Sequence, residues 1–308
     1  MPDIVVAEFI DEAALAGLAG YDVLYDRELF RKPLELHRAV YSARGLIVRN
    51  QTQVRGPLLE SAPALKVIGR LGVGLDNIDT QVCKNRGIAV CPATGANDDS
   101  VAEYVIAASL ILLRPAYGAA PLMTAGRWPR AALMGGEIGG KTLGLVGFGA
   151  IARATAARAQ ALGMTTIAYD PHIPAADLAW TDTRRVDLHT LMAESDVVSL
   201  HVPLNPATRR MIGAPELARC KPGAIVVNAA RGGVIDEEAL VGALRAGKLG
   251  GAALDVFETE PMTAASGARF ADVPGLVLTP HIAGVTRESN ARVSAVTVAN
   301  VRRVLEGA

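Results

Sequence analysis

The chain has 308 residues, half of them hydrophobic, and a formal net charge of zero. This is enough for two domains with sizeable cores. A balanced charge without a lysine or arginine run gives no support to nucleic-acid or membrane-surface binding, and no apolar run has transmembrane length.

Strand-like and helix-like segments alternate from the N-terminus onward. Apolar runs predict strands at residues 4–7, 22–25, 45–48 and 65–70, and helical patterns occur at 11–18 and 34–40. The first run lacks the charged start of a signal peptide. Such alternation predicts a parallel sheet with helices on both faces, a first doubly wound domain.

Two loops at strand ends of this region are candidates for ligand binding. Gly72 and Gly74 follow a strand, and the backbone N–H groups between them suit a carboxylate, although a simple tight turn is the alternative. Arg49 and Arg55 follow another strand. Either could pair with an acidic group of a substrate or be a solvated surface charge.

A transition between domains is predicted over residues 98–140. Residues 90–97 form a Pro- and Gly-bearing connector, and a nearly all-apolar helix follows at 100–113, which would be buried. An irregular stretch then leads to Lys141, where the second domain starts its sheet.

The most informative stretch is residues 141–171, which has the pattern strand, glycine turn, helix, strand. Gly147, Gly149 and Ala152 fill the three positions of the dinucleotide-binding fingerprint, and the helix N-terminus would face the pyrophosphate. Asp170 ends the next strand, where a carboxylate can bind the adenosine ribose and would repel a 2′-phosphate. This favours NAD over NADP, against the alternative of a purely structural turn.

Further strands at 196–204, 224–228, 250–254 and 276–278 bring titratable side chains to the same sheet edge, before a last helix at 287–305. Hydride transfer to a carbonyl needs an acid, a group that orients that acid, and a cation for the substrate. His281, Glu260 and Arg231 suit these three roles. His201 is the rival acid, and each of them could instead be structural.

The three cysteines have no metal-ligand spacing, and no cluster of histidines, cysteines and carboxylates does. We therefore expect no metal, and we expect thiols in a reducing cytoplasm. A nucleophilic role for Cys83 or Cys91 is the weaker alternative.

Motifs along nearly the whole chain resemble those of the D-isomer-specific 2-hydroxyacid dehydrogenases, and within that family the phosphoglycerate dehydrogenases. The motifs are RLGVGLDNID from Arg70, NDDSVAE from Asn97, GKTLGLVGFG from Gly140, HVP from His201, NAARGG from Asn228, DVFETEP from Asp255 and TPHIAG from Thr279.

The resemblance implies that Arg231 binds the substrate carboxylate and carbonyl, that His281 is the proton donor and that Glu260 is its partner. Substrate contacts are implied for Arg49, Gly72, Val73 and Gly74. Cofactor contacts are implied for Val73, Gly147, Gly149, Ala150, Ile151, Asp170, Val202, Pro203, Ala229, Ala230, Asp255 and Gly284.

The resemblance also implies two Rossmann-like domains with a cleft between them. The substrate domain would comprise residues 1–97 and 285–308, and the NAD-binding domain 98–284. A homodimer through the nucleotide domain is expected.

Departures from the family pattern bear on the substrate. The C-terminal regulatory domain of longer phosphoglycerate dehydrogenases is not in this sequence, so serine feedback is not expected, and Glu260 stands where a formate dehydrogenase would carry glutamine. We expect an acid with an anionic distal group, like 3-phosphoglycerate or sulfolactate, and the alternative is a glyoxylate or hydroxypyruvate reductase. The extra polar groups of the segment Asn50–Arg55 after Arg49 leave 3-phosphoglycerate itself open. A nucleotide-sensing corepressor on the same fold is the alternative of another class.

Overall fold

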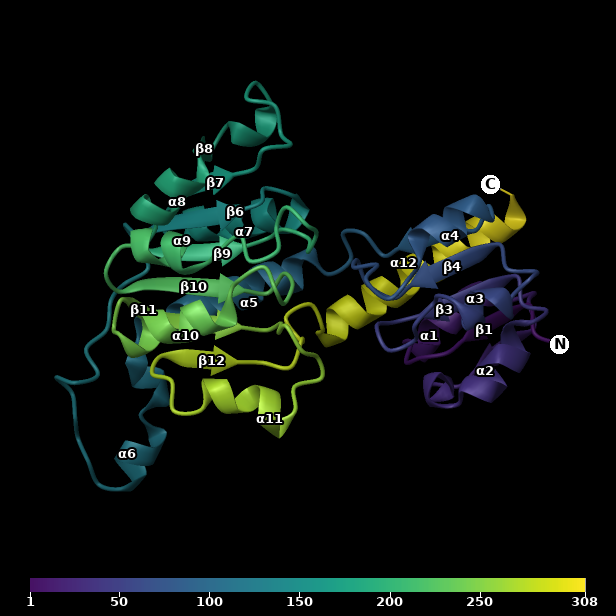
Figure 1. Cartoon of the computed structure of the whole chain (residues 1–308), viewed down its shortest axis with the longest axis horizontal. Coiled ribbons are helices and arrows are strands. Elements are labelled where there is room, and N and C mark those ends of the chain that lie inside the picture. Colours follow the sequence, from purple (N-terminus) through teal and green to yellow (C-terminus); the bar gives the residue numbers. More distant parts are fainter. Residues whose placement is uncertain (308) are drawn as a thin grey trace. The chain divides into compact units, whose positions relative to one another are not determined.

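The computed structural model describes residues 1–307. Contacts divide the chain into two compact units. Unit 1 comprises residues 1–97 and the segment from Val285 onward, and unit 2 comprises residues 98–284 (Figure 1). Each unit contains one parallel sheet, so the predicted class of two parallel-sheet α/β domains is confirmed.

The sheet of unit 1 has five strands in the order β2-β1-β3-β4-β5. The strands are β1 (Ile4–Val6), β2 (Val23–Tyr25), β3 (Gly45–Val48), β4 (Val67–Arg70) and β5 (Ala89–Pro92). The order reverses between β1 and β3. In open α/β sheets, ligands bind outside the carboxyl ends of the strands at such a reversal.

Two hydrophobic cores cover the two faces of this sheet. Alternation along β1 sends Ile4 and Val6 to one core and Val5 to the other. The first core is completed by α12 (Arg287–Glu306), whose buried Val301 approaches Gly69 so closely that a Cβ there would lie 2.6 Å from it. The other helices of the unit are α1 (Glu12–Leu15), α2 (Pro33–Val40), α3 (Pro57–Glu60) and α4 (Thr80–Asn85), with 3-10 turns at η1 (Ala16–Leu18) and η2 (Leu29–Arg31).

The expected connector at 90–97 is wrong over its first residues, because β5 occupies Ala89–Pro92. A proline is tolerated there because β5 is an edge strand that pairs only with β4, and no further strand needs the missing N–H. The predicted helix at 11–18 exists as a short α-helix, α1, that tightens into the 3-10 turn η1.

The sheet of unit 2 has seven strands in the order β12-β11-β10-β9-β6-β7-β8. The strands are β6 (Thr142–Val146), β7 (Thr165–Tyr169), β8 (Arg184–Arg185), β9 (Val197–Leu200), β10 (Ala224–Asn228), β11 (Leu249–Leu254) and β12 (Leu276–Leu278). Its order reverses between β6 and β9, so the glycine turn after β6 lies at the expected ligand edge.

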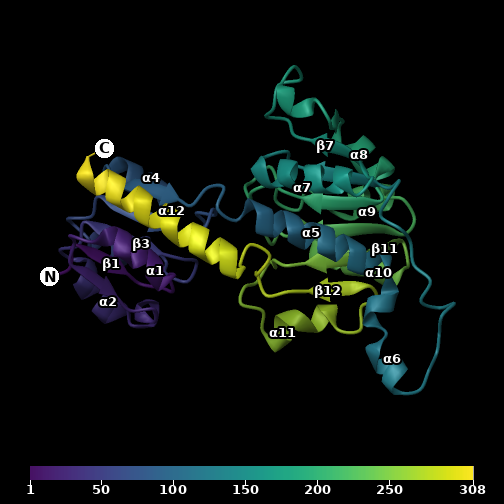
Figure 2. The same ribbon diagram turned by 180° about the vertical axis from the view of Figure 1, so that it is seen from behind.

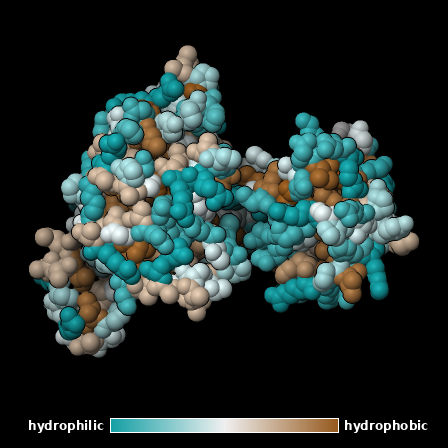
Figure 3. All heavy atoms as spheres, in the orientation of Figure 1, coloured by the Kyte–Doolittle hydropathy of each residue, from teal (hydrophilic) through white to brown (hydrophobic). Residues whose placement is uncertain are grey.

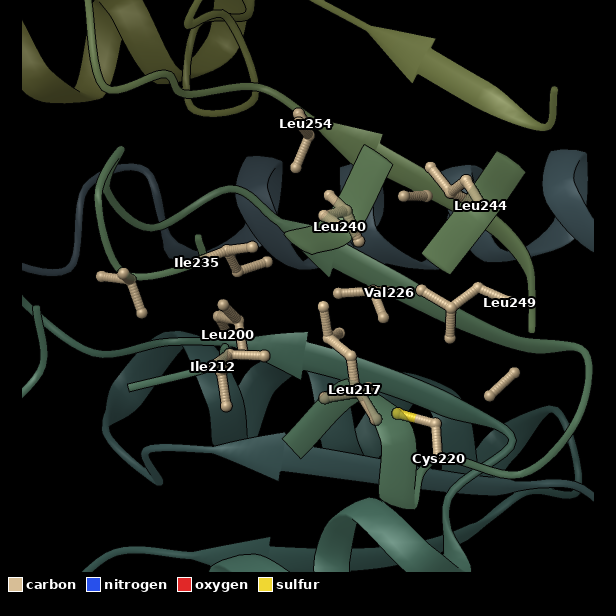
Figure 4. Close-up of a cluster of buried hydrophobic side chains, with 14 of the residues drawn as sticks. Leu200, Ile212, Leu217, Cys220, Val226, Ile235, Leu240, Leu244, Leu249 and Leu254 are labelled. Atoms are coloured by element: carbon tan, nitrogen blue, oxygen red, sulfur yellow. The ribbon is translucent and has the colours of Figure 1, made fainter. Parts of the chain in front are cut away.

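Helices cover both faces of this second sheet. On one face lie α5 (Asp98–Leu113) and α7 (Ala150–Ala161), which are side by side in Figure 2. On the other lie α8 (Leu188–Glu194), α9 (Ala214–Arg219) and α10 (Glu237–Arg245), whose leucines meet Val226 of β10 in the core shown in Figure 4. Shorter elements are η3 (Pro115–Gly118), α6 (Ala120–Thr124), η4 (Leu178–Trp180), α11 (Ala264–Gly267) and η5 (Ala268–Phe270).

Candidate active site

Most of the predicted site residues lie at the carboxyl edge of the unit 2 sheet. Parallel strands all end at the same edge, so the loops after β6, β7, β9, β10, β11 and β12 are brought together there. These loops and the start of α7 carry Gly147, Gly149, Ala150, Ile151, Asp170, Val202, Pro203, Ala229, Ala230, Arg231, Asp255, Glu260, His281 and Gly284.

The glycine turn after β6 requires its first glycine. Gly147 has φ +87°, and a Cβ at this position would lie 2.6 Å from the carbonyl oxygen of His201. Gly149 precedes α7 without a side-chain cap, and a Cβ there would meet no atom within 4 Å. The first N–H groups of α7 therefore have no side-chain cap, a geometry that suits a pyrophosphate approaching the backbone.

Asp170 ties the end of β7 to this turn. One carboxylate oxygen accepts the backbone N–H of Phe148 at 2.9 Å, and the other accepts that of His172 at 2.9 Å. The side chain thus holds the glycine turn and still has lone pairs available, because each oxygen can accept more than one hydrogen bond. These residues fit NAD, with the carboxylate suited to a ribose hydroxyl.

His281 and Glu260 form a hydrogen-bonded pair. Nδ1 of His281 lies 2.7 Å from Oε2 of Glu260, and the other oxygen, Oε1, accepts the backbone N–H of Phe257 at 2.9 Å. Because a carboxylate only accepts, Nδ1 carries the proton of this bond and Nε2 is left to exchange protons. The imidazole side chain is 44% exposed, which leaves it open to a substrate.

The environment of Glu260 keeps it ionised. Burial is the largest single influence and raises its pKa, but the hydrogen bonds from His281 and Phe257 and the charges of His281 and Arg231 together outweigh it, so the pKa lies below its ordinary 4.5. A depressed pKa means that the carboxylate keeps its charge at neutral pH and that the pair weakens only as the pH falls through that lowered value.

Arg231 sits in a turn that a buried asparagine organises. The side chain of Asn228, at the end of β10, donates to the carbonyl of Arg231 at 3.0 Å and accepts the N–H of Ala230 at 3.1 Å. Gly232 follows, and a Cβ there would overlap the backbone of Phe257. The loop of Arg231 therefore lies directly against the loop that leads to Glu260.

Asp255 is almost completely buried, with 1% of its surface exposed. Its carboxylate accepts the hydroxyl of Thr279 at 2.6 Å and the backbone N–H groups of Ile282 and Ala283, each at 2.8 Å. Its backbone oxygen accepts the N–H of His281 at 2.8 Å. The sequence analysis implied a cofactor contact for Asp255, and the structure adds that it organises the histidine loop.

His201, the rival acid, is in an unsuitable environment. Burial of its imidazole lowers the pKa to about 4, and Nε2 lies 3.0 Å from the hydroxyl of Ser199. An imidazole with this pKa is neutral near pH 7 and cannot supply a proton there. Of the two candidates, His281 has the geometry of a general acid. Among residues 1–307, no group of histidines, cysteines and carboxylates could hold a metal ion.

The remaining predicted residues lie in unit 1, in the loops after the neighbouring strands β3 and β4. Gly72 has φ +141°, and the loop folds over the side chain of Arg70, whose Nε donates to the carbonyl of Gly74 at 2.8 Å. The backbone N–H groups of Val73 and Gly74 donate to no protein acceptor within residues 1–307. Backbone N–H groups without a protein acceptor are what a carboxylate site at this loop would require.

Arg49 is half-buried rather than a solvated surface charge. Its Nη2 donates to Oδ1 of Asn290 at 2.6 Å, and its guanidinium lies 5.3 Å from the ring centroid of Phe9. Burial lowers its pKa, which the negative charge of Glu8 partly offsets. Nε is buried and has no partner within the described part of the chain. By contrast, Nη2 of Arg55 donates to the carbonyl of Asp76.

Sequence reasoning did not find the residues that hold the Arg49 loop. Glu8, which is 3% exposed, accepts the backbone N–H groups of Arg49, Gln51 and Thr52 at 2.9, 3.1 and 2.9 Å. Asn77 donates to the carbonyls of Arg49 and Thr52. The available signal was an acid directly after a fully apolar strand, because a carboxylate there is buried and must be satisfied.

The fold and the site define a nicotinamide-dependent oxidoreductase. A family model described as "D-isomer specific 2-hydroxyacid dehydrogenase, NAD binding domain" matches residues 106–283, more than half of the chain. The chain belongs to the D-isomer specific 2-hydroxyacid dehydrogenase family and is an NAD-dependent enzyme.

Relatives within the family differ in their substrates. The chain is 53% identical to an (S)-sulfolactate dehydrogenase of Chromohalobacter salexigens, over 99% of both proteins. It is 45% identical to a hydroxypyruvate reductase of Thermotoga maritima, over 84% of each. It is 39% identical to a D-3-phosphoglycerate dehydrogenase of Archaeoglobus fulgidus. That match covers 99% of this chain but 57% of the relative.

A solved structure supports the cofactor. The D-lactate dehydrogenase of Aquifex aeolicus, complexed with NAD and lactic acid, matches with a TM-score of 0.87 at 28% identity, and the match covers 99% of this chain and 96% of that one. The family resemblance and NAD, both predicted from the sequence, are confirmed.

Proposed function

We propose that this enzyme oxidises or forms a 2-hydroxyacid that carries a second anionic group, and that a sulfolactate-like acid is its substrate. The observation that carries the proposal is Arg49, a half-buried guanidinium held by Asn290 with its Nε unpartnered. An arginine in this state gains most from an anion with several oxygens, such as a sulfonate or phosphate. The 53% identity to a sulfolactate dehydrogenase supports the sulfonate.

The stereochemistry of such a substrate agrees with the family. Sulfur outranks oxygen in the priority rules, so the sulfonated carbon of sulfolactate takes precedence over the carboxylate. The label (S) therefore describes the same spatial arrangement at C2 as the D configuration of glycerate. An (S)-sulfolactate enzyme handles the same hand of substrate as a D-2-hydroxyacid dehydrogenase.

The proposed mechanism assigns one task to each residue of the unit 2 edge. When bound, the cofactor would supply a hydride to C2 as NADH or accept one from C2 as NAD+. In the reductive direction, Nε2–H of His281 gives its proton to the developing alkoxide, while Glu260 accepts Nδ1–H and holds the ring in place. Arg231 binds the substrate carboxylate with its planar fork and polarises the neighbouring carbonyl. In the oxidative direction, His281 takes up the hydroxyl proton.

We propose contacts for residues of each unit. The distal anion is assigned to Arg49 and the substrate carboxylate to the N–H groups of Val73 and Gly74, next to Gly72. Asp170 is assigned to the ribose. The other cofactor contacts that we propose are Val73, Gly147, Gly149, Ala150, Ile151, Val202, Pro203, Ala229, Ala230, Asp255 and Gly284. Unit 1 is then the substrate domain, and unit 2 the NAD-binding domain.

We also propose a homodimer formed through unit 2. Large apolar side chains are exposed between α5 and β6, with Tyr117 at 67%, Trp128 at 74% and Met134 at 83%. The protruding segment that contains α6, at the lower left of Figure 3, shows hydrophobic residues on its surface. Separately, a groove between α5 and α7 is lined by Ile106, Ala107, Leu110, Ala161 and Leu162 together with the charged Glu103 and Arg158. Clustered exposed apolar side chains of this kind suit a protein interface.

A cytoplasmic location is part of the proposal. It is supported by the three free cysteines, of which Cys83 and Cys220 are buried, since a reducing compartment keeps thiols unpaired. Within the described residues, no helix is both long and apolar enough to cross a membrane.

The substrate is tested by NADH oxidation with a panel of 2-oxoacids: sulfopyruvate, 3-phosphohydroxypyruvate, hydroxypyruvate and glyoxylate. We expect the highest kcat/KM for sulfopyruvate. In Arg49→Ala this preference over hydroxypyruvate should fall by roughly 10- to 100-fold, the range of a charge-assisted hydrogen bond. The matched control Arg49→Lys keeps the positive charge but loses the planar guanidinium. Its preference for sulfopyruvate should lie between those of the wild type and Arg49→Ala.

The alternative outcomes identify other functions. Equal turnover of hydroxypyruvate in wild type and Arg49→Ala, with no preference for the anionic acids, would favour a hydroxypyruvate reductase like the relative from Thermotoga maritima. Preference for the phosphorylated acid would favour a phosphoglycerate dehydrogenase. Binding of NADH without turnover of any acid would support a nucleotide-sensing protein.

A further inference from the structure

A chain of hydroxyl groups runs from helix α5 to the buried carboxylate of Asp255. The hydroxyl of Tyr104 lies 2.7 Å from that of Thr279, and the hydroxyl of Thr279 lies 2.6 Å from Oδ1 of Asp255. A carboxylate can only accept, so Thr279 donates to Asp255, and Tyr104 must then donate to Thr279. The direction of both bonds is fixed by the charge at the end of the chain.

The tyrosine is suited to be the terminal donor. Burial raises its pKa, the bond to Thr279 lowers it less, and the charge of Asp255 raises it further, so the hydroxyl keeps its proton. It belongs to α5, which lies against β10 and β11 on one face of the unit 2 sheet (Figure 2). A largely apolar helix thereby supplies the tyrosine hydroxyl to the hydrogen bonds that end at Asp255.

The loop that Asp255 holds, at the other end of this series of hydrogen bonds, has a strained backbone. His281 has φ +53°, a left-handed conformation that a non-glycine residue keeps only where its surroundings require it. Asp255 provides that requirement, because its backbone accepts the N–H of His281 and its carboxylate accepts those of Ile282 and Ala283. The conformation of the histidine loop therefore depends on where the carboxylate of Asp255 is held.

We propose that Tyr104 is a positioning residue for His281, acting through Thr279 and Asp255. Its donated hydrogen bond fixes the hydroxyl of Thr279 and strengthens the bond from Thr279 to the carboxylate, as expected for linked bonds in a water-poor site. The carboxylate is then held where it fixes residues 281–283. The inference rests on the proposed role of His281 as proton donor.

The first test uses Tyr104→Phe, which removes only the hydroxyl. We expect kcat to fall roughly 2- to 10-fold, the range of one neutral hydrogen bond, with an unchanged KM for the oxoacid and an unchanged Kd for NADH. Amide hydrogen exchange should become faster in residues 281–284 and stay unchanged in β6 and β9. The matched control is Ser109→Ala, which removes a buried α5 hydroxyl that, within residues 1–307, donates to the carbonyl of Val105 in its own helix.

A double-mutant cycle tests the route. Thr279→Val removes the intermediate hydroxyl and should lower kcat at least as much as Tyr104→Phe, while Thr279→Ser should restore most of the loss. If Tyr104 acts through Thr279, adding Tyr104→Phe to Thr279→Val should cost nothing more. Additive losses would overturn the inference, because the two residues would then act separately.

Two further outcomes would also overturn it. One is an unchanged kcat with unchanged exchange at 281–284 in Tyr104→Phe. The other is faster exchange throughout unit 2, which would make Tyr104 a general packing residue. Failure of the proposed role of His281 is distinguishable, since His281→Ala would then retain full turnover, whereas failure of this inference alone leaves His281→Ala inactive.

Discussion

Unit 1 and unit 2 each place a buried carboxylate after one strand and use it to hold the loop after the neighbouring strand. Glu8 follows β1 and accepts three backbone N–H groups from the loop after β3. Asp255 follows β11 and accepts two N–H groups and a hydroxyl from the loop after β12. The first loop presents Arg49 with an unpartnered Nε, and the second presents His281 already bonded to Glu260.

With the proposed roles of Arg49 and His281, this difference separates substrate recognition from chemistry. The unit 2 loop has its hydrogen bonds largely satisfied within the protein, as a catalytic group must be oriented before the substrate arrives. In the unit 1 loop, the buried Nε of Arg49 has no acceptor within the described residues. The cost of removing this donor from water is offset only when a bound molecule supplies an acceptor. The loops at the two reversals of strand order also differ. In unit 2 the loop after β6 is a glycine turn suited to phosphates. In unit 1 the loop after β1 contains Glu8, whose carboxylate would repel phosphates.

The largest predicted effect comes from removing His281, the proposed acid in the unit 2 loop. His281→Ala should lower kcat by roughly 100- to 10,000-fold, the usual contribution of a general acid, with an unchanged NADH affinity. The measurement is steady-state kinetics with NADH binding by fluorescence. His201→Asn is the control, and it should retain most of the activity because His201 is neutral at pH 7. A reversal of the two results would make His201 the acid.

The next effect concerns the glycine turn. Gly147→Ala should cost about 2–5 kcal/mol of stability, because the residue has φ +87° and its Cβ would press on the carbonyl of His201. Gly149→Ala should fold normally, since its Cβ meets nothing within 4 Å, and yet bind NADH more weakly. Thermal unfolding and NADH titration of both variants check this. Unchanged NADH affinity in Gly149→Ala would contradict the assignment of the turn to the pyrophosphate.

A pH profile sharpens the comparison at Glu260. Glu260→Gln should lower kcat at neutral pH by roughly 10- to 100-fold, because the protonated imidazole loses a charge-assisted partner. Since the pKa of Glu260 lies below 4.5, the wild-type carboxylate is ionised at neutral pH, and its contribution should be lost only as the pH falls through that lowered value. Steady-state kinetics of both proteins check this, and a kcat of Glu260→Gln equal to that of the wild type at neutral pH would contradict the role of the carboxylate as the partner of His281.

The smallest predicted effect concerns Glu8, which holds the Arg49 loop of unit 1. Glu8→Gln leaves one of its three backbone donors without an acceptor and should destabilise unit 1 by about 1–3 kcal/mol. NADH affinity should not change, while the KM for an anionic oxoacid should rise because the Arg49 loop loosens. Glu35→Gln, an exposed position on α2, is the matched control in thermal unfolding and kinetics. Weakened NADH binding in Glu8→Gln would show that the two carboxylates do not act independently.

Local patterns were sufficient for the fold and for the pairing of His281 with Glu260. Apolar runs marked the buried strands, the glycine fingerprint marked the turn, and both partners of the pair follow neighbouring strands of one parallel sheet. The supporting contacts were not predictable in the same way. Asn290 meets Arg49 across 241 residues of sequence, and neither carries a local signal of the other. The strand β5 was missed because its proline is permitted only at an edge.

The interruption of unit 1 by unit 2 has a consequence for synthesis. The core of unit 1 needs Val293, Val298, Val301 and Leu305 of α12, and these are translated after the whole of unit 2. Because domains tend to fold as they emerge from the ribosome, unit 2 can complete its core first, and unit 1 waits for its last helix. Asn290, the partner of Arg49, arrives with that helix. With the proposed roles of the two units, a nascent chain would be competent to bind nucleotide before it could recognise an acid.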